Sequence, residues 1–224
     1  MIVFENVTKR YGQRAVLDNV SFSISPGEFV SVVGHSGAGK STLIHALIGA
    51  ENIQHGRISV DHYAINTLKE KSLQYYRRKI GVVFQDYKLL PQKNVHENVA
   101  FAMEVCGEAN HHIQKRVREV LEIVGLQDQR RHFPRQLSGG ECQRAAIARA
   151  LVHHPSLIIA DEPTGNLDPN NAKEIIELLL KINKNGTTVI LATHNPILVD
   201  HIHKRVIRLE NGRIVSDKTQ SGYF

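Results

Sequence analysis

A glycine-rich segment at residues 34–41 constrains this sequence more than any other feature. Its residues, GHSGAGKS, complete the pattern G-x-x-x-x-G-K-[ST] and lie between the apolar run FVSVV and the run TLIHALI. That order predicts a strand, a tight loop and a helix, which is the context in which this pattern binds phosphate. Glycines let successive backbone N–H groups point at one anion, and the start of the helix adds positive potential. The segment therefore predicts a nucleoside triphosphate site.

Each residue of this loop has an expected part in the site. Lys40 would reach the β- and γ-phosphates, and the hydroxyl of Ser41 would bind Mg²⁺. The backbone of the loop would surround the phosphate groups. We therefore expect the nucleotide-binding residues to be Gly34, His35, Ser36, Gly37, Ala38, Gly39, Lys40, Ser41 and Thr42.

Two adjacent acids end a second apolar run, LIIA at residues 157–160. Phosphoryl transfer that depends on Mg²⁺ needs such acids beside a phosphate loop, with Asp161 holding the metal and Glu162 polarising a water molecule. A pair of carboxylates that only caps a helix is the alternative. It is the weaker one, because burying both at a strand end is costly without a cation.

The hydrophobic pattern predicts one α/β domain over residues 1–224 with three parts. Alternating segments at 2–7, 20–24 and 58–60 favour antiparallel strands, whereas the buried runs at 80–84, 157–160 and 188–192 favour parallel core strands. Helical periodicity covers 94–106, 112–124 and 138–152, and Asp168-Pro169 is typical of the start of a helix that continues to about Lys184. Segments 205–209 and 213–216 flank the turn of a hairpin. Because the block from about 86 to 136 has almost no strand signal, we expect an inserted helical subdomain there.

The composition limits where the chain can be located and which partners and metals it can bind. No apolar stretch approaches the ~20 residues of a membrane span, so we expect a cytoplasmic protein whose membrane role depends on a partner. The net charge is +6, but the basic residues are dispersed and are not interleaved with aromatic residues, which argues against a nucleic-acid partner. The two cysteines lack CxxC spacing and are expected to be reduced, and the 13 histidines show no metal-ligand spacing.

The segment Leu137–Glu141, LSGGE, remains ambiguous on its residues alone. A hydroxyl group, two small residues and the free N–H groups of a helix start could form a second anion-binding surface. The same residues could equally be an ordinary N-terminal cap made by Ser138.

Taken together, these motifs resemble an ABC-type ATPase. The phosphate loop, the LSGGE segment, the Asp161-Glu162 strand, Asn166-Leu167-Asp168 and His194 occur in the order and spacing of that family, from Val3 to about Asp217. The resemblance implies ATP as the nucleotide, an ATP-hydrolysing activity and a head-to-tail homodimer in the ATP-bound state. It also implies that the LSGGE residues contact the γ-phosphate held by the other copy, with Asp168 in a loop at the same interface. These contacts across the dimer would come from Ser138, Gly139, Gly140, Glu141 and Asp168.

Three further residues have predicted roles at the ATP site. By resemblance, Gln85 would contact Mg²⁺ and respond to the membrane partner, and Tyr11 would stack on adenine. His194 follows an apolar strand, where a neutral imidazole can bind the γ-phosphate and orient water. The alternatives are a solvated turn residue for Gln85, a strand-end aromatic for Tyr11 and a structural histidine. Many relatives have Gln where this chain has Glu141, which leaves the role of that residue open.

Within the family, three segments resemble the FtsE-type cell-division ATPases: residues 76–91 (YRRKIGVVFQDYKLLP), 94–102 and 4–11. This implies an FtsX-like integral membrane partner, a peripheral location on the cytoplasmic face of the membrane at the division site, and indirect control of peptidoglycan hydrolases. The alternative is the ATPase of a lipoprotein-release or macrolide-export system, because those relatives share residues 161–169. A nucleic-acid-acting ABC protein is the competing class, and steeply salt-sensitive DNA or RNA binding would identify it.

Overall fold

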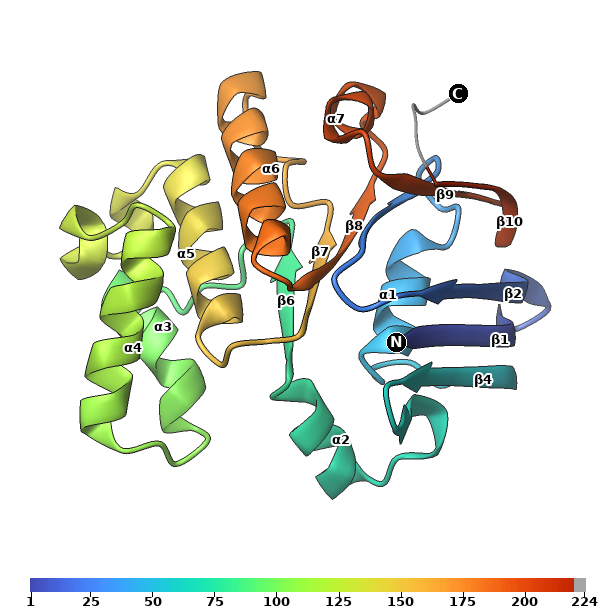
Figure 1. Ribbon diagram of the computed structural model, residues 1–224, viewed down its shortest axis with the longest axis horizontal. Helices are drawn as coiled ribbons and strands as arrows, with labels where there is room; N and C mark the ends of the chain where they lie inside the picture. The colour runs from blue at the N-terminus through green and yellow to red at the C-terminus, as the bar shows by residue number, and fades with distance from the viewer. Residues whose placement is uncertain (220–224) are drawn as a thin grey trace.

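The computed structural model describes residues 1–219. Strands β1, β2 and β4 lie at one end of an elongated molecule and helices α3 and α4 at the other (Figure 1). The strands are β1 (Ile2–Tyr11), β2 (Arg14–Ile24), β3 (Phe29–Val33), β4 (His55–Val60), β5 (Tyr63–Ala64), β6 (Ile80–Phe84), β7 (Leu157–Asp161), β8 (Thr188–Thr193), β9 (Arg205–Glu210) and β10 (Arg213–Lys218). The helices are α1 (Lys40–Leu47), α2 (Glu70–Arg77), α3 (Val95–Glu104), α4 (Asn110–Ile123), α5 (Gly139–Leu151), α6 (Pro169–Lys184) and α7 (Pro196–Ile202), and short 3-10 turns cover Ile65–Thr67, Asp128–Arg131 and Pro134–Gln136.

A six-stranded sheet with the order β10-β9-β3-β8-β7-β6 forms the centre of the fold. The strands from β9 to β6 pair in parallel, and β10 closes the edge as an antiparallel hairpin with β9. Strands β3, β7 and β8 are fully buried along their length, which explains their continuous apolar runs. Because parallel strands end at the same edge, the residues after β3, β6, β7 and β8 are brought together there.

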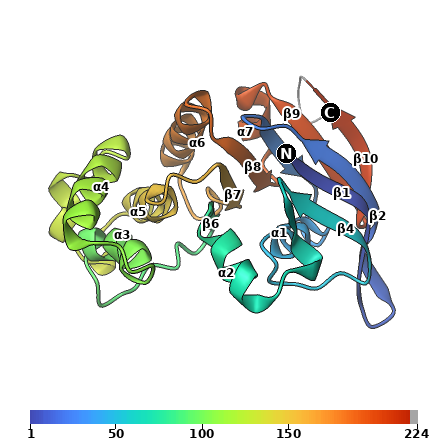
Figure 2. The same ribbon diagram turned by 60° about the horizontal axis from the view of Figure 1, so that its bottom comes forward.

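Alternate residues of this sheet enter two different cores. On β8, Val189 and Leu191 pack with α6 and α7, whereas Ile190 and Ala192 pack with α1. A second, antiparallel sheet with the order β2-β1-β4-β5 covers the α1 side, and the stacked rings of Phe4 and Phe22 lie 4.5 Å apart in that core. Helix α1 is therefore held between the two sheets (Figure 2).

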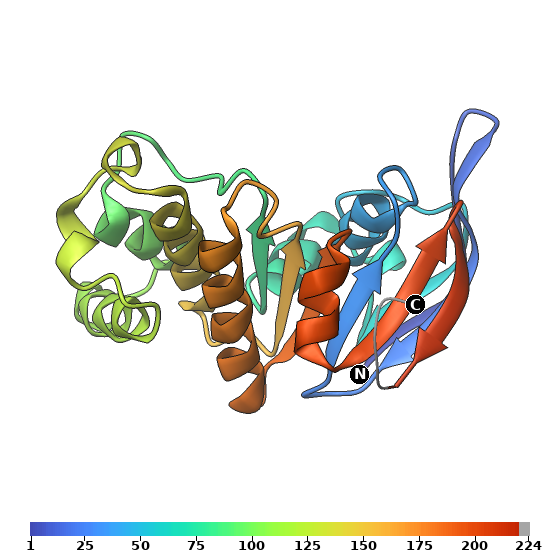
Figure 3. The same cartoon turned by 90° about the horizontal axis from the view of Figure 1, so that it is seen from above.

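Helices α3 and α4 pack against α5 at the far end of the molecule, and α6 lies beside α5 (Figure 3). Their buried side chains continue the core formed by α6 and by one face of the large sheet. No strand lies between β6 and β7 in the part of the chain that the structure describes. The predicted α/β class, antiparallel β part and inserted helical part are therefore confirmed, whereas the subdomain boundary near residue 136 stays a prediction.

Local boundaries differ from the sequence expectations at several places. Strand β1 continues from Val7 to Tyr11 and β2 begins at Arg14 instead of Val20, because these strands extend as a ribbon beyond the buried alternating residues and bulges shift their register. Helices α2 and α7 were not predicted. Each has only seven or eight residues, which is too short for a clear helical period.

None of the helices described over residues 1–219 is long and apolar enough to cross a membrane.

Candidate active site

The phosphate loop connects the buried end of β3 to the start of α1, as the sequence predicts. Two of its glycines are required by close packing. A Cβ on Gly34 would lie 2.3 Å from the carbonyl oxygen of Leu209, and one on Gly39 would lie 2.6 Å from that of Val16. Gly39 also has a φ of +111°, in the region that favours glycine. The loop can therefore lie directly against β2 and β9 only because these positions lack side chains.

A cavity of about 330 Å³ opens beside this loop. Its wall combines five segments of the sequence: strand β2, the phosphate loop with the start of α1, the residue after β6, the residue after β7 and the residue after β8. The lining residues are Val16, Ser36, Gly37, Gly39, Lys40, Ser41, Thr42, Gln85, Glu162 and His194. Val16, on β2, is the one lining residue that the sequence did not suggest, since nothing marks it apart from other strand residues.

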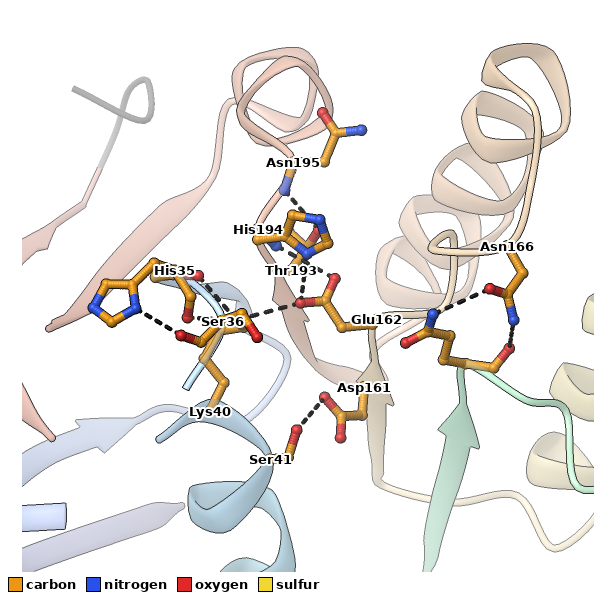
Figure 4. A network of polar contacts seen from close by, with 12 residues as sticks. His35, Ser36, Lys40, Ser41, Asp161, Glu162, Asn166, Thr193, His194 and Asn195 are labelled. Carbon is orange, nitrogen blue, oxygen red and sulfur yellow. Dashed lines mark hydrogen bonds and ion pairs between the residues drawn. The ribbon is translucent and has the colours of Figure 1, made fainter. Parts of the chain in front are cut away.

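Lys40 is buried and organises the loop from within (Figure 4). Its Nζ donates hydrogen bonds to the carbonyl oxygens of Gly34 at 2.9 Å and His35 at 3.3 Å. The same ammonium lies 3.3 Å from Oε1 of Glu162. Lys40 is thus already at the cavity wall, and it is held by groups that a phosphate could replace.

Ser41 and Asp161 face each other across the start of α1 and the end of β7, with Oγ of Ser41 3.3 Å from Oδ1 of Asp161 (Figure 4). Burial raises the pKa of Asp161, and the neighbouring Glu162 carboxylate raises it further, against the lowering effect of the Ser41 hydrogen bond. A hydroxyl and a carboxylate oxygen are the ligands that Mg²⁺ prefers. The raised pKa means that a nearby cation would relieve the cost of the Asp161 charge, so these residues fit the expected metal.

Replacing Asp161 with Asn should raise the melting temperature of the nucleotide-free protein at neutral pH by about 2–4 °C. The folded-state pKa lies above the unfolded value, so the stabilising contribution of the protonated form is fully present below the unfolded pKa and is lost as pH rises through the folded pKa. Asn carries no charge, so the free-energy cost of burying the ionised Asp161 carboxylate is absent from this variant. Thermal unfolding against pH checks this, with the exposed Asp128→Asn as the matched control. An unchanged or lower melting temperature for Asp161→Asn would contradict the cause given.

Glu162 lies at the junction of β7 and β8. Its backbone has a φ of +48°, and its N–H donates to the carbonyl oxygen of Ala192 at 2.9 Å. Such a conformation is costly for a residue other than glycine and clusters at functional sites. The Glu162 carboxylate lies 2.9 Å from Nδ1 of His194 through Oε1, and Oε2 accepts from the His194 backbone N–H at 3.3 Å. The two catalytic candidates therefore contact each other directly.

Gln85 follows β6 and reaches the other side of the cavity. Its Nε2 donates to Oδ1 of Asn166 at 3.1 Å, and Nδ2 of Asn166 donates to the Gln85 carbonyl oxygen at 3.2 Å (Figure 4). A Cβ on Gly165 would lie 2.8 Å from the Gln85 amide nitrogen. Asn166 therefore fixes Gln85, a role that the sequence did not indicate, because the two residues are 81 positions apart.

Ser138 caps α5 in this structure. Its Oγ accepts from the Glu141 backbone N–H at 3.3 Å, and Oε2 of Glu141 accepts from the Ser138 backbone N–H at 2.8 Å. These hydrogen bonds with Ser138 lower the pKa of Glu141. A Cβ on Gly140 would lie 2.2 Å from Oδ1 of Asn171, so α5 packs closely against α6 at this point. The capping interpretation is confirmed, and the contact with ATP of another copy stays a prediction.

Four predicted residues do not line the cavity themselves, although other residues of the same segments do: Gly34, His35, Ala38 and Asp161. Three further predicted regions lie away from its wall. Tyr11 lies at the end of β1, half exposed, with Nζ of Lys9 4.8 Å from its ring centroid. Asp168 caps α6 and accepts from the backbone N–H groups of Asn170 and Asn171, which with the Asn171 side chain lower its pKa. Residues 138–141 start α5. Stacking by Tyr11 and the contacts of the other two regions across a dimer remain predictions.

The profile of the ABC transporter family matches residues 17–165, which include the phosphate loop, Gln85, the α5 cap and the Asp161-Glu162 pair. The chain belongs to this family. It is therefore an ABC-type ATPase that binds ATP and ADP. The phosphate loop of this family forms part of the site described above.

Two curated relatives match the chain along its whole length. The cell division ATP-binding protein FtsE of Bacillus subtilis is 52% identical and that of Streptococcus pneumoniae serotype 2 is 51% identical. Each alignment covers 100% of this chain and 97–98% of the relative. At this level of identity the resemblance to FtsE-type ATPases inferred from the sequence is confirmed.

A solved structure shares the fold over its full extent. The dimeric ABC transporter cassette MJ0796 is 37% identical and superimposes with a TM-score of 0.89 over 100% of both chains. The same cassette is also solved as a dimer in a post-hydrolysis state bound to ADP and Pi.

Proposed function

We propose that this chain is the ATP-hydrolysing subunit of an FtsEX-type cell-division complex. The observation that carries the proposal is the end-to-end match to relatives named FtsE, at 51–52% identity. In this complex an ATP-driven dimer cycle would act on an FtsX-like integral membrane protein. The membrane protein would in turn control peptidoglycan hydrolases at the septum. The chain would lie peripherally on the cytoplasmic face of the cell membrane, at the division site.

The geometry supports a defined division of labour among the residues at the cavity. Glu162 would act as the base that polarises the attacking water, and Lys40 would neutralise charge on the phosphates. Ser41 and Asp161, with Gln85 facing them, would hold Mg²⁺. The metal would supply charge neutralisation at the β- and γ-phosphates. Phosphoryl transfer depends mainly on such positioning and electrostatics.

The contacts among Lys40, Glu162 and His194 imply a change on nucleotide binding. Lys40 must exchange its 3.3 Å contact with Glu162 for phosphate oxygens. If Nδ1 of His194 donates to Glu162, the Nε2 atom of a neutral ring is an acceptor and cannot donate to a phosphate. His194 must therefore release Glu162 or change tautomer before it binds the γ-phosphate. We infer that Glu162 can act as the base only when Lys40 and His194 turn from its carboxylate to the phosphates.

A homodimer would complete the site. At the starts of α5 and α6, Ser138, Gly139 and Asp168 are exposed and Glu141 is half-buried, where a second copy could reach them, whereas Gly140 is buried. The dimeric structures of the MJ0796 cassette support this arrangement. Because ATP would bind the closed dimer better than the open one, hydrolysis would remove that preference and let the dimer open.

The membrane partner would bind in a groove of about 510 Å³ between α2, α3, α5 and β6. This groove adjoins both the helical part and the strand that leads to Gln85. A cytoplasmic helix of the partner held there could transmit its movement to the ATP site.

A membrane pull-down tests the proposed function. Tagged Glu162→Gln protein with ATP should co-elute an FtsX-like integral membrane protein, whereas Lys40→Ala protein under the same conditions should capture much less. Capture of a lipoprotein-release or export permease would leave the ATPase roles intact and replace the cell-division function. Failure to capture any membrane protein, with salt-sensitive binding to DNA or RNA instead, would overturn the proposal.

A further inference from the structure

Lys9 is a buried cation on the strand that ends at Tyr11. Its side chain is only 7% exposed and continues the row of buried side chains along β1, which consists of the apolar residues Ile2, Phe4 and Val7. Lysine is almost never buried this deeply unless its ammonium has a partner. The contacts of Lys9 must therefore compensate for the burial of its charge.

The segment after α1 supplies two of these contacts. Nζ of Lys9 lies 2.7 Å from Oε2 of Glu51 and donates to the carbonyl oxygen of Asn52 at 2.7 Å. The third contact is the ring of Tyr11, whose centroid lies 4.8 Å from Nζ. A cation over a ring face is attracted to the ring, and the attraction is stronger where water is excluded. Lys9 thus joins Glu51 to the ring of Tyr11.

Glu51 holds the same ring at its polar end. Hydrogen bonds from the Lys9 ammonium and from the Tyr11 hydroxyl lower the pKa of Glu51, so its carboxylate is ionised at neutral pH. The ring is therefore fixed at its hydroxyl by Glu51 and on one face by Lys9. Tyr11 is nevertheless 48% exposed, so a planar ligand can stack only on the face away from Lys9.

Glu51 is also fixed to the helix that follows the phosphate loop. The backbone N–H groups of residues 50 and 51 donate to the carbonyl oxygen of His45, in the last turn of α1, at 2.8 and 3.2 Å. The first residue of this helix is Lys40. One short helix therefore connects the phosphate loop to the carboxylate that holds Tyr11.

Tyr11 lies close to the ATP cavity. It pairs with Arg14 on β2, and Val16, two positions further along that strand, lines the cavity. The ring is therefore beside the cavity wall, where a base attached to phosphates in the loop could reach it.

The backbone of β1 is held independently of the Lys9 side chain. Gln54 accepts from the Arg10 N–H through Oε1 at 2.8 Å and donates through Nε2 to the Arg10 carbonyl oxygen at 3.3 Å. Its own backbone N–H donates to the carbonyl oxygen of Thr8 at 2.9 Å. Removing the Lys9 ammonium should therefore release the Tyr11 ring without releasing the strand.

We propose that Lys9 and Glu51 are positioning residues for the adenine base of ATP. They hold the ring of Tyr11 in the orientation on which the base stacks. They also tie this ring to α1, so that one helix sets the separation between the base and the phosphate loop. The inference rests on the ATP-binding part of the proposed function and does not depend on the identity of the membrane partner.

Steady-state ATP hydrolysis tests this role with Lys9→Met, which keeps a stem of similar length and removes the ammonium. KM for ATP should rise about fivefold to tenfold, with kcat within about twofold of the parent, because the lost interaction is made equally in the ground state and the transition state. Lys79→Met is the matched control, since Nζ of Lys79 lies 5.3 Å from the ring centroid of Tyr63 and neither residue lines the cavity. It should leave both constants unchanged. An unchanged KM in Lys9→Met, or a fall in kcat alone, overturns the inference.

A double-mutant cycle shows whether Lys9 acts through the ring. Tyr11→Ala should raise KM by about 10–100-fold, the loss expected when a base no longer stacks on an aromatic side chain. Lys9→Met added to Tyr11→Ala should raise KM by less than about twofold more, because no ring remains to be held. Full additivity, or an unchanged KM in Tyr11→Ala, overturns the inference and leaves the proposed function standing.

A second variant covers the case in which Lys9→Met does not fold. Glu51→Gln still accepts hydrogen bonds but lacks the charge that holds Lys9, so it should raise KM about twofold to fivefold, and only while Tyr11 is present. An equal rise in the Tyr11→Ala background overturns the inference. If the parent protein does not hydrolyse ATP, the proposed function fails and this inference fails with it.

Discussion

Glu162→Gln is expected to lower the rate of ATP hydrolysis by about 10²–10⁴-fold, the range attributed to a positioned general base. Gln has almost the same shape as Glu but cannot take a proton from water. The backbone at residue 162, with its φ of +48° and its hydrogen bond to Ala192, does not depend on the carboxylate. The effect should therefore fall on turnover and not on folding. Phosphate release at saturating ATP measures it.

The same substitution should leave ATP affinity unchanged or make it tighter. Oε1 of Glu162 lies 3.3 Å from the ammonium of Lys40, the group expected to bind phosphate. An amide at position 162 attracts that ammonium less, so ATP meets less competition. Without hydrolysis the ATP-bound protein should also accumulate as a dimer, which size-exclusion chromatography with ATP detects.

Glu177→Gln is the matched control, because Glu177 is an exposed carboxylate that also lies near a histidine, with Oε1 3.4 Å from Nε2 of His201. It should hydrolyse ATP at the parent rate. Full turnover by Glu162→Gln would remove Glu162 from the role of base. A parallel loss of ATP binding would instead show that the carboxylate supports the loop.

The sequence predicted the parts of the site that rest on local pattern. The phosphate loop, the strand before Asp161 and the strand before His194 each carry their own signal, and parallel pairing then forces their ends together. Asp161 and Ala192 are paired in the β7–β8 register, which places Glu162 beside His194. The parallel pairing of the strands therefore brings the residues of three short sequence patterns together at one cavity.

Other features depend on contacts that no local pattern encodes. Asn166 acts on Gln85 across 81 positions, and Arg149 acts on Lys88 across 61. The positive φ of Glu162 is set by the neighbouring strand, not by a turn residue such as glycine. The LSGGE segment shows the converse case: its residues left two alternatives open, of which the cap is present in the structure, while the contact with another copy of the chain stays a prediction.

Lys40→Ala is expected to weaken ATP binding by about 10²–10⁴-fold. Hydrogen bonds to charged groups contribute about 1.5–3 kcal/mol each, and about 1.4 kcal/mol corresponds to a tenfold change in affinity. Lys40 is buried beside the cavity and would contact two phosphates, so both contributions are lost together. Titration calorimetry with ATP and Mg²⁺ measures the change.

Two causes could produce that loss, and Lys40→Met separates them. Lys40 also ties the loop through the carbonyl oxygens of Gly34 and His35, so removing it could disorder the loop as well as remove the charge. Met retains most of the buried stem but neither donates nor carries charge. If Lys40→Met binds ATP as weakly as Lys40→Ala while its melting temperature stays closer to that of the parent, the ammonium itself provides the affinity. An unchanged affinity in either variant would contradict the assignment of this loop to the phosphates.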